Sequence, residues 1–298
     1  MYIRRLSEET IMPTDYSKLK ANGFMLQKQK DTFSMRLRVL GGNISVEQLD
    51  TISKVAKKYA QGYVHLTSRQ GVEIPFVKLE DIDAIVEELH QGGVELGASG
   101  PRVRTVTACQ GGRCCPSGCI DAYEIAEELD KRYFGKTLPH KFKFGVTGCP
   151  NNCLKAEEND LGVKGGMEVA WNEENCVRCG ACVRICRRKA ISLVDGKIVF
   201  DKDKCHRCGK CARLCPKKAI SGKPGFVVSF AGTFGNDVVR GKNILPMIES
   251  KDALFRVTDV TLEYFEKNAQ KGERFVKTLE RLGWEDFTNK VRDAYEGK

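Results

Sequence analysis

Fourteen cysteines, eight of them in a repeated pattern, constrain this chain of 298 residues more than any other feature. The pattern C-x2-C-x2-C-x3-C occurs twice. Cys176 and Lys189 of the first run correspond to Cys205 and Lys218 of the second at an offset of 29 residues. Thiols at this spacing are too close for a framework of disulfides and are typical of metal or redox sites. We therefore expect residues 170–223, the cysteine repeat, to bind metal as an insertion in a larger fold.

The cysteine repeat resembles a bacterial two-cluster ferredoxin, in which three cysteines of one run and the last cysteine of the other hold each [4Fe–4S] cluster. Pro216 follows the last cysteine as in that motif, whereas Arg187 stands where the first run would have proline. Structural zinc is the alternative for CxxC pairs, but tandem runs of four cysteines favour clusters. The resemblance implies two clusters, one on Cys176, Cys179, Cys182 and Cys215 and the other on Cys205, Cys208, Cys211 and Cys186.

The composition indicates a globular protein, because 41% of the residues are hydrophobic and 30% are charged. The first residues, MYIRRLSEETIMPTDY, lack the apolar core of a signal peptide, and no run approaches the roughly 18 apolar residues of a membrane span. We therefore expect a cytoplasmic protein without a membrane span. The formal net charge of +10 would suit nucleic acid. Bound four-iron clusters carry about −2 each when oxidised and would offset it, so no nucleic-acid partner is expected.

Hydrophobic periodicity in the first hundred residues predicts an α+β unit. Its expected elements are strands over 33–39, 62–67 and 72–77 and helices over 46–60 and 80–91. Ser45 and Gln48 have the spacing of a capping box for the first of these helices. Gly92 and Gly93 end the second, because glycine readily adopts the backbone conformation that terminates a helix.

A second unit begins near Pro101 and carries the remaining six cysteines in two loops. Its expected elements are strands over 102–109, 140–149 and 225–231, a helix over 118–133 capped by Ser117, and mostly helices over 258–295. The first loop, CQGGRCCPSGC, contains Cys109, Cys114, Cys115 and Cys119; the second, TGCPNNC, contains Cys149 and Cys153. A third four-iron cluster needs four thiolates, which two such loops at strand ends can supply.

These two loops resemble the sirohaem and [4Fe–4S] motif of sulfite and nitrite reductases, which reads C-x5-C followed by proline and then TGCPNNC. The resemblance implies that the third cluster is held by Cys109, Cys115, Cys149 and Cys153. It also implies that Cys153 bridges this cluster to the iron of sirohaem. Pro150, Asn151 and the following asparagine would shape a tight turn against the haem.

Two cysteines of the first loop are left over. Cys114 could compete with Cys115 for the cluster, but only Cys115 has the spacing and the following proline of the family. We interpret Cys114 and Cys119 as small buried residues without a redox role.

Four more segments are similar to the same family: RLRVLGG, LTSRQG, KFK and, loosely, SFAGTFGNDVVRG. Sulfite is a small dianion and sirohaem carries eight carboxylates, so both need fixed cationic donors. The resemblance implies substrate ligands at Arg38, Arg104, Lys141 and Lys143, with Arg102 as an alternative to Arg104. It implies haem contacts at Arg36, Thr67, Arg69, Gln70 and Asn151, and in the Gly-rich loop at Gly232, Thr233 and Gly235.

The fold implied is a sulfite/nitrite reductase-type α+β fold. A ferredoxin-like N-terminal domain would span residues 1–98, and an α/β sirohaem domain residues 99–169 and 224–298. An inserted two-cluster ferredoxin would span residues 170–223. Larger family members contain two copies of this fold related by a pseudo-twofold axis, whereas this chain has one. We therefore expect a homo-oligomer or pairing with a homologous subunit, with each site shared between chains.

The function implied is six-electron reduction of sulfite to sulfide at a sirohaem coupled through a cysteine thiolate to a [4Fe–4S] cluster. Two ferredoxin-type clusters, which bring the total to three [4Fe–4S] clusters, would relay the electrons from a donor protein or reductase subunit. Reduction of nitrite to ammonia also takes six electrons and can use the same haem. Two further alternatives are an electron-transfer subunit without sirohaem and a zinc-bound nucleic-acid protein.

Overall fold

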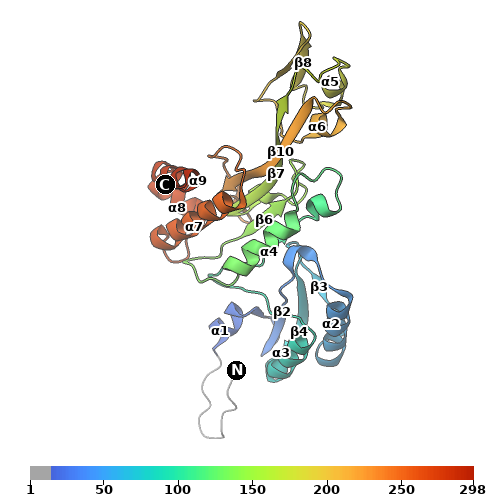
Figure 1. Cartoon of the computed structure of the whole chain (residues 1–298). Helices are drawn as coiled ribbons and strands as arrows, with labels where there is room; N and C mark the ends of the chain where they lie inside the picture. Colours follow the sequence, from blue (N-terminus) through green and yellow to red (C-terminus); the bar gives the residue numbers. More distant parts are fainter. Residues whose placement is uncertain (1–14) are drawn as a thin grey trace. The chain divides into compact units, whose positions relative to one another are not determined.

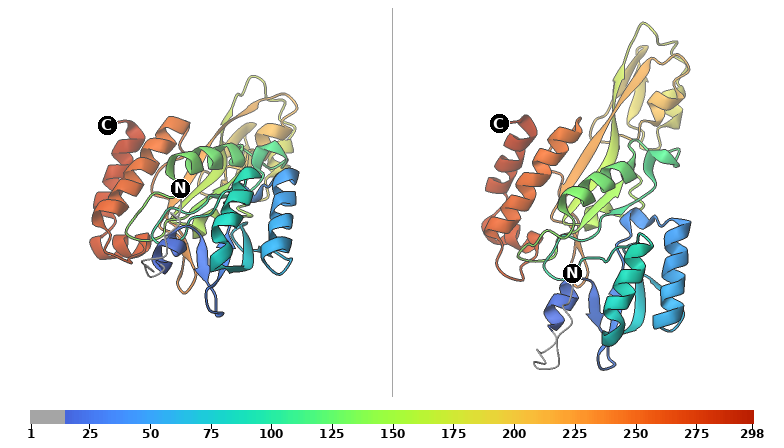
Figure 2. Two further views of the ribbon diagram at one scale, coloured as in Figure 1. Left: turned by 90° about the horizontal axis from the view of Figure 1, so that it is seen from below. Right: turned by 60° about the horizontal axis from the view of Figure 1, so that its bottom comes forward.

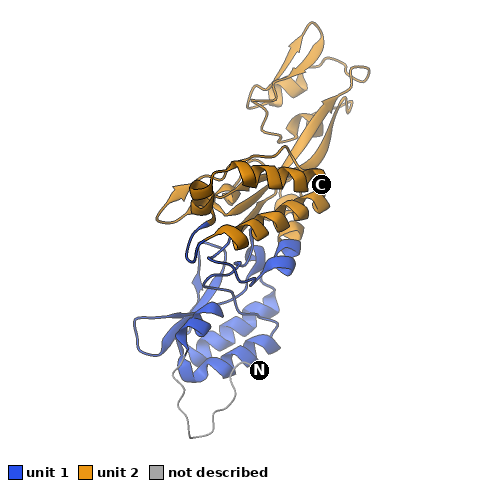
Figure 3. Ribbon diagram, turned by 90° about the vertical axis from the view of Figure 1, so that its left-hand side faces the viewer, with its two compact units in different colours: residues 1–107, 127–143, 270–274 blue, residues 108–126, 144–269, 275–298 orange. Residues whose placement is uncertain are grey.

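The structure, a computed structural model, describes residues 15–298. Residues 1–14, on which the expectation of no signal peptide rests, lie outside the described part. The chain divides into two compact units, coloured separately in Figure 3. Unit 1 contains residues up to 107, residues 127–143 and residues 270–274; unit 2 contains residues 108–126, 144–269 and 275–298. The three expected domains stay a prediction, since these units group the residues differently.

Unit 1 contains an antiparallel four-stranded sheet in the order β1-β2-β4-β3. Its strands are β1 (Phe24–Leu26), β2 (Thr32–Arg36), β3 (His65–Leu66) and β4 (Val72–Lys78), and its helices are α1 (Tyr16–Ala21), α2 (Val46–Tyr59) and α3 (Ile82–Gln91). Alternate residues of β2 point inward, so that Phe33 and Met35 pack with Ile74, Ile52 and Ile85 in one core. Figure 2 shows α2 and α3 side by side on the sheet.

The two helices expected in the first hundred residues are confirmed within two residues at each end. The capping box is complete: Ser45 Oγ accepts the Gln48 amide N–H at 3.2 Å, and Gln48 Oε1 accepts the Ser45 amide N–H at 3.1 Å. The expected strand over 62–67 is reduced to the two residues of β3.

Unit 2 is built on a sheet in the order β10-β7-β6-β5. Its strands are β5 (Thr107–Ala108, which straddles the unit boundary), β6 (Phe144–Thr147), β7 (Leu161–Trp171) and β10 (Ile220–Phe230), with a small β11 (Thr233–Phe234) and β12 (Val238–Val239) hairpin. The helices α7 (Lys251–Asn268), α8 (Phe275–Leu282) and α9 (Glu285–Glu296) lie together (Figure 1). Phe287 of α9 packs edge-on against Phe230 of β10, with 5.4 Å between the ring centroids, and so joins these helices to the sheet. Within residues 15–298, no helix has the length and apolar character needed to cross a bilayer.

The cysteine repeat occupies the far end of the long β7–β10 hairpin (Figure 1). It contains α5 (Ala181–Ile185), β8 (Ile191–Val194), β9 (Lys197–Phe200) and α6 (Lys210–Leu214). The internal repeat predicted from the sequence is confirmed in the backbone, because α5 and α6 stand at the same offset of 29 residues. Two pairs of positions with left-handed conformation follow the same offset: Arg178 (φ 55°) with Arg207 (φ 55°), and Lys189 (φ 52°) with Lys218 (φ 51°).

The start of the expected helix over 118–133 is wrong. Helix α4 (Ala122–Tyr133) begins four residues later, because the carboxylate of Asp121 accepts the amide N–H groups of Tyr123 and Glu124. Ser117 therefore does not cap it. The residues before Asp121 form a tightly folded loop instead: a Cβ added to Gly118 would lie 2.4 Å from the backbone nitrogen of Gly112.

Candidate functional site

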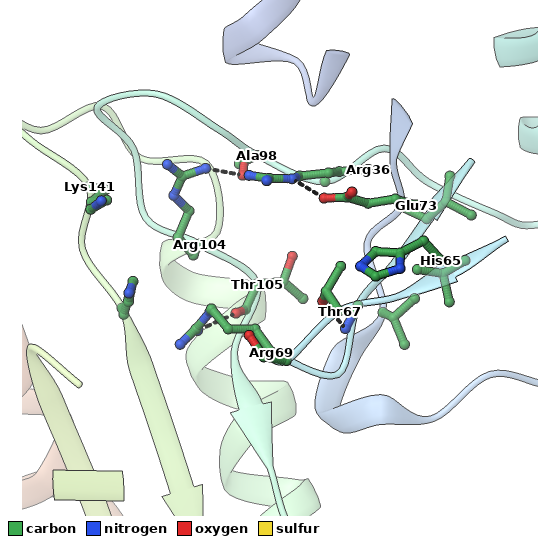
Figure 4. Close-up of a pocket in the computed structure, with 16 residues that line it drawn as sticks. Arg36, His65, Thr67, Arg69, Glu73, Ala98, Arg104, Thr105 and Lys141 are labelled. Atoms are coloured by element: carbon green, nitrogen blue, oxygen red, sulfur yellow. Dashed lines mark hydrogen bonds and ion pairs between the residues drawn. The ribbon is translucent and has the colours of Figure 1, made fainter. Parts of the chain in front are cut away.

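A cationic cavity of about 450 Å³ opens on unit 1. It lies where the ends of β2 and β3 meet the segments 97–105 and 141–143 (Figure 4). Among the described residues that line it, one is acidic, Glu73, and five are cationic: Arg36, Arg69, Arg104, Lys141 and Lys143. A cavity with this excess of positive charge is suited to an anionic ligand.

Arg104 is fixed by the backbone beside it. Its Nη1 donates to the carbonyl of Ala98 at 2.6 Å and its Nη2 to the carbonyl of Gly100 at 3.0 Å. Burial lowers the pKa of Arg104 to about 10, and repulsion from Arg36 adds to this shift. Arg102, the alternative to Arg104, bonds Asn22 and does not line the cavity. The geometry thus favours Arg104 as the anion ligand of the two.

Of the four residues in unit 1 that are expected to contact the haem, three line the same cavity. Arg36 Nε donates to Glu73 at 2.6 Å, and Arg69 Nη2 donates to the carbonyl of Thr105 at 3.3 Å. Thr67 also lines the cavity. Gln70 does not; it has a left-handed backbone (φ 59°), and its side chain packs against Gly42.

Arg38, expected among the substrate ligands, does not line this cavity. Its guanidinium forms salt bridges with the buried Asp130 and with Glu95 and lies 4.1 Å from the ring centroid of Phe134. These contacts join the segment after β2 to α4, so the charge of Arg38 stabilises the fold. The substrate role of Arg38 stays a prediction. Its contacts with Asp130 and Glu95 do not favour that role.

The cysteine loops of unit 2 meet around Cys149. The Cys109 amide N–H donates to the carbonyl of Val146 at 3.0 Å, and the amide N–H of Gly148 donates to Cys109 Sγ at 3.1 Å. Burial raises the pKa of the Cys149 thiol, and repulsion from the neighbouring thiols adds to the effect. These neighbours are Cys119, Cys115 and Cys109. The contact of Gly148 with the Cys109 sulfur brings Cys109 beside the start of the Cys149 loop, so two of the four cysteines expected to hold the third cluster lie in adjoining segments.

The other cysteines of these loops differ in surroundings. Cys153 and Cys114 are exposed, and neither is among the thiols that act on Cys149. Cys115 is exposed as well, and the expectation that Cys114 is buried is wrong. Cys119, interpreted from the sequence as a passive residue, contacts the cysteine repeat: Arg213 Nη1 lies 3.9 Å from its sulfur. No sequence motif pointed to that contact, because it joins positions 94 residues apart.

A buried carboxylate supports the TGCPNNC loop. Glu157 accepts hydrogen bonds from Arg240 Nε at 2.5 Å, from Lys164 and, at 3.5 Å, from Asn152. Asn152 has a left-handed backbone (φ 53°) and accepts the Ala156 amide N–H at 2.9 Å, which closes the turn. Asn151, expected at the haem, lines a cavity of the cysteine repeat.

The Gly-rich loop also packs against Glu157. A Cβ added to Gly232 would come within 2.0 Å of the Glu157 carbonyl oxygen, so only glycine allows this approach. Thr233 is buried and Gly235 faces open space. None of the three lines the cationic cavity of unit 1, and their expected haem contact stays a prediction.

The eight cysteines of the repeat line two separate cavities. The first, of about 20 Å³, is lined by Cys176, Cys179, Cys182 and Cys215. The second, of about 150 Å³, is lined by Cys186, Cys205, Cys208 and Cys211. Each cavity thus receives three cysteines of one run and the last cysteine of the other, which is the exchange that the ferredoxin resemblance implies.

Backbone N–H groups lie against three of these sulfurs, those of Cys186, Cys205 and Cys215. The amide N–H groups of Ala190 and Arg207 donate to Cys186 at 3.3 Å and to Cys205 at 3.4 Å. Burial raises the pKa of Cys211 to about 11. At Cys215 burial also acts to raise the pKa, but backbone N–H groups of the segment ending at Ile220 outweigh it and lower the pKa.

The donor set fits iron–sulfur clusters better than single zinc ions. Among residues 15–298, no three His, Cys, Asp or Glu side chains converge closely enough to bind one metal ion. One zinc ion needs its sulfurs at about 2.3 Å from a common point, whereas a four-iron cube holds its cysteines farther apart. The cationic cavity likewise fits the carboxylates of sirohaem or a small oxyanion.

Family models match most of the chain. The model described as the nitrite and sulphite reductase 4Fe-4S domain matches residues 99–298, and the model described as the nitrite/sulfite reductase ferredoxin-like half domain matches residues 25–92. A crystal structure of dissimilatory sulfite reductase I superposes with a TM-score of 0.72 over 88% of this chain and 69% of that one, at 20% identity, and so shares the fold.

Two relatives of similar sequence are named as sulfite reductases. The coenzyme F420-dependent sulfite reductase of Methanocaldococcus jannaschii is 35% identical over 88% of this chain, which spans 42% of that protein's length. A subunit of the anaerobic sulfite reductase of Salmonella typhimurium is 29% identical over 63% of this chain and 61% of its own length. Together with the family models, these matches establish that the chain belongs to the nitrite and sulphite reductase family.

Proposed function

We propose that this chain reduces sulfite to sulfide at a sirohaem coupled through the Cys153 thiolate to a [4Fe–4S] cluster. The observation that carries the proposal is the cationic cavity of unit 1, in which five basic side chains surround a space of about 450 Å³. Guanidinium and ammonium groups are the donors that bind oxyanions and carboxylates. Family membership and the sulfite reductases among the relatives support the same substrate class.

Each group of the cavity has a proposed role. Arg104, held at 2.6 Å by a backbone carbonyl, and the nearby Lys141 and Lys143 would bind the sulfite oxygens, with Arg38 as a fourth candidate. Arg36 and Arg69, with Thr67 and Gln70, would bind the carboxylates of the haem. Because Arg104 already has a lowered pKa among positive neighbours, a bound anion would relieve their repulsion.

The chemistry requires protons as well as electrons. Bisulfite, six electrons and six protons give hydrosulfide and three waters. Sirohaem, when bound, would supply an iron centre for the substrate and deliver the electrons. Lys141 and Lys143 can each donate an ammonium proton to an oxygen that leaves as water, while Arg104 stays charged and stabilises the remaining oxyanion.

The thiols divide into three proposed cluster sites. Cys109, Cys115, Cys149 and Cys153 would hold the cluster beside the haem, and the cysteine repeat, as a ferredoxin-type domain, would hold two more on the cysteines of its two cavities. Electrons from a donor protein would pass through the repeat. We also propose that two chains, or this chain and a homologous subunit, pair and share their sites.

Anaerobic purification with iron analysis, an absorption spectrum and an assay of sulfite-dependent oxidation of reduced methyl viologen tests the proposal. We expect about thirteen irons per chain, the sum of three four-iron clusters and one haem, together with turnover of sulfite. Iron without a haem spectrum would reduce the chain to an electron-transfer subunit, and zinc without iron would overturn the cluster assignments.

Nitrite is the second candidate substrate, because the matching family models cover nitrite and sulphite reductases alike. Reduction to ammonia takes six electrons at the same kind of site. Assaying both anions with one preparation decides between them: a higher kcat/KM for nitrite than for sulfite would reverse our assignment.

A further inference from the structure

The positive charge of this protein is concentrated in the cysteine repeat. Residues 170–223 contain fourteen lysines and arginines against five aspartates and glutamates, a formal net charge of +9, whereas the whole chain has +10. Two bound clusters at about −2 each would leave the segment at roughly +5. The remaining 244 residues are nearly neutral in sum, so the charge marks one part of the surface.

The second cavity of the repeat faces the cysteine loops of unit 2. Arg213 Nη2 donates to the carbonyl of Cys208, a cysteine of that cavity, at 2.6 Å. Through Nη1 the same guanidinium reaches the Gly118 carbonyl at 3.3 Å and the Cys119 sulfur at 3.9 Å. Pro150 and Asn151 of the TGCPNNC loop also line the second cavity. The second cavity is thus the inner one.

The first cavity has an exposed cysteine among its four, whereas the cysteines of the second are buried or half-buried. Cys179 is exposed, and the neighbouring Val177 exposes 58% of its surface. Arg178 Nε donates to the Gly196 carbonyl at 3.0 Å, which brings the β8–β9 turn, and with it the exposed Lys197, to this cavity. The exposed Lys217 follows the fourth cysteine after one residue. We define Val177, Lys197 and Lys217 as the entry face.

We propose that the entry face docks an acidic electron-carrier protein, which delivers single electrons to the cluster on Cys176, Cys179, Cys182 and Cys215. This deepens, and rests on, the proposed function. An apolar side chain with lysines around it, beside an exposed cluster ligand, suits the small, charge-steered contacts of electron-transfer complexes. The cluster of the second cavity then passes each electron inward past Arg213. Each step moves one electron: the carrier is oxidised by one electron and the cluster is reduced by one.

The test uses the full chain with its cofactors and stopped-flow mixing with the hydroquinone form of an acidic flavodoxin. Its oxidation to the semiquinone and the bleaching of the clusters report the transfer. The test variant is K197E/K217E. The control K54E/K57E changes the net charge equally at two exposed lysines of α2. Sulfite-dependent oxidation of reduced methyl viologen is measured in parallel, because this small reductant needs no docking surface.

We expect the wild-type rate to fall as NaCl is added, and K197E/K217E to react about tenfold more slowly at low ionic strength. K54E/K57E should stay within about twofold of wild type. An electron-transfer rate that does not change with NaCl concentration, or equal slowing in both variants, would contradict the docking role of the entry face. If the wild type does not reduce sulfite with methyl viologen, but K197E/K217E still slows electron transfer from flavodoxin, the proposed function is wrong and the docking assignment is retained.

Discussion

Arg38 donates two hydrogen bonds to the same oxygen of Asp130, from Nε at 2.9 Å and from Nη2 at 2.7 Å. Asp130 is 2% exposed, and its other oxygen accepts the Val106 amide N–H at 3.1 Å. Burial raises the pKa of Asp130 even with Arg38 beside it. Removal of the guanidinium would leave a buried carboxylate without its counter-charge, which is costly.

We therefore expect Arg38→Met to lower the free energy of unfolding by about 3 kcal/mol, measured by urea titration. Adding Asp130→Asn to this variant should recover much of the loss, because no uncompensated charge remains. If Arg38→Met instead unfolds like the wild type and has lost sulfite turnover, Arg38 is a substrate ligand, as the sequence motif implies.

The two lysines of the cavity allow a separate test of the chemistry. Lys141→Met and Lys143→Met each remove an ammonium group that we propose donates protons to the substrate oxygens. We expect turnover of sulfite to fall on the order of a hundredfold in each variant, with the haem spectrum nearly unchanged. Lys131→Met on α4 is the matched control, since Lys131 is exposed and does not line the cavity. Normal turnover in both test variants would exclude the two lysines from the reaction.

Local patterns predicted the parts of the fold that local interactions determine. The capping box at Ser45 fixed the start of α2, and the offset of 29 residues between the cysteine runs predicted the repeat of α5 in α6. Strand β7 was missed because glycines at 162, 165 and 166 interrupt its apolar pattern. The structure explains two of them. A Cβ on Gly162 would lie 2.2 Å from the Ala156 carbonyl oxygen, and a Cβ on Gly165 would lie 2.3 Å from the Gly148 carbonyl oxygen, so Gly165 allows the approach of the TGCPNNC loop.

Long-range contacts limited the prediction of the site. The family motifs predicted all five cations that line the cavity, Arg104 and the two lysines as substrate ligands and Arg36 and Arg69 as haem contacts. A motif cannot report which carboxylate a side chain will meet, so the pairing of Arg38 with Asp130, 92 residues away, was not predictable. The contact of Arg213 with Cys119 was not predictable for the same reason.

Cysteine variants test the third cluster residue by residue. Cys153→Ser removes the proposed bridging thiolate, and we expect iron to fall from about thirteen to about eight or nine per chain, with loss of the haem absorption. Cys114→Ser is the matched control, because Cys114 is also exposed and lies in the first cysteine loop. Iron content measured on both decides the matter: a loss in Cys114→Ser with none in Cys153→Ser would reverse the ligand assignment.

Glu157 makes the support of the TGCPNNC loop sensitive to pH. Burial acts to raise its pKa, but the hydrogen bonds from Arg240 and Lys164 outweigh burial and hold the pKa below its ordinary 4.5. A carboxyl group whose pKa is lowered on folding stabilises the fold above its unfolded-state pKa. This stabilisation is lost as the pH falls through the lower folded-state value.

We therefore expect Glu157→Gln to be less stable than wild type by about 3 kcal/mol at pH 7, and the difference to shrink as the pH falls below 4.5. Urea unfolding between about pH 3.5 and 7, on samples of equal iron content, measures it. Glu158→Gln is the control and should change little at any pH. Within residues 15–298, the one ion pair of Glu158 is with the exposed Lys155, at 3.9 Å. A difference between Glu157→Gln and wild type that stays constant with pH would mean that the charge of Glu157 does not stabilise the loop, and that its packing alone does.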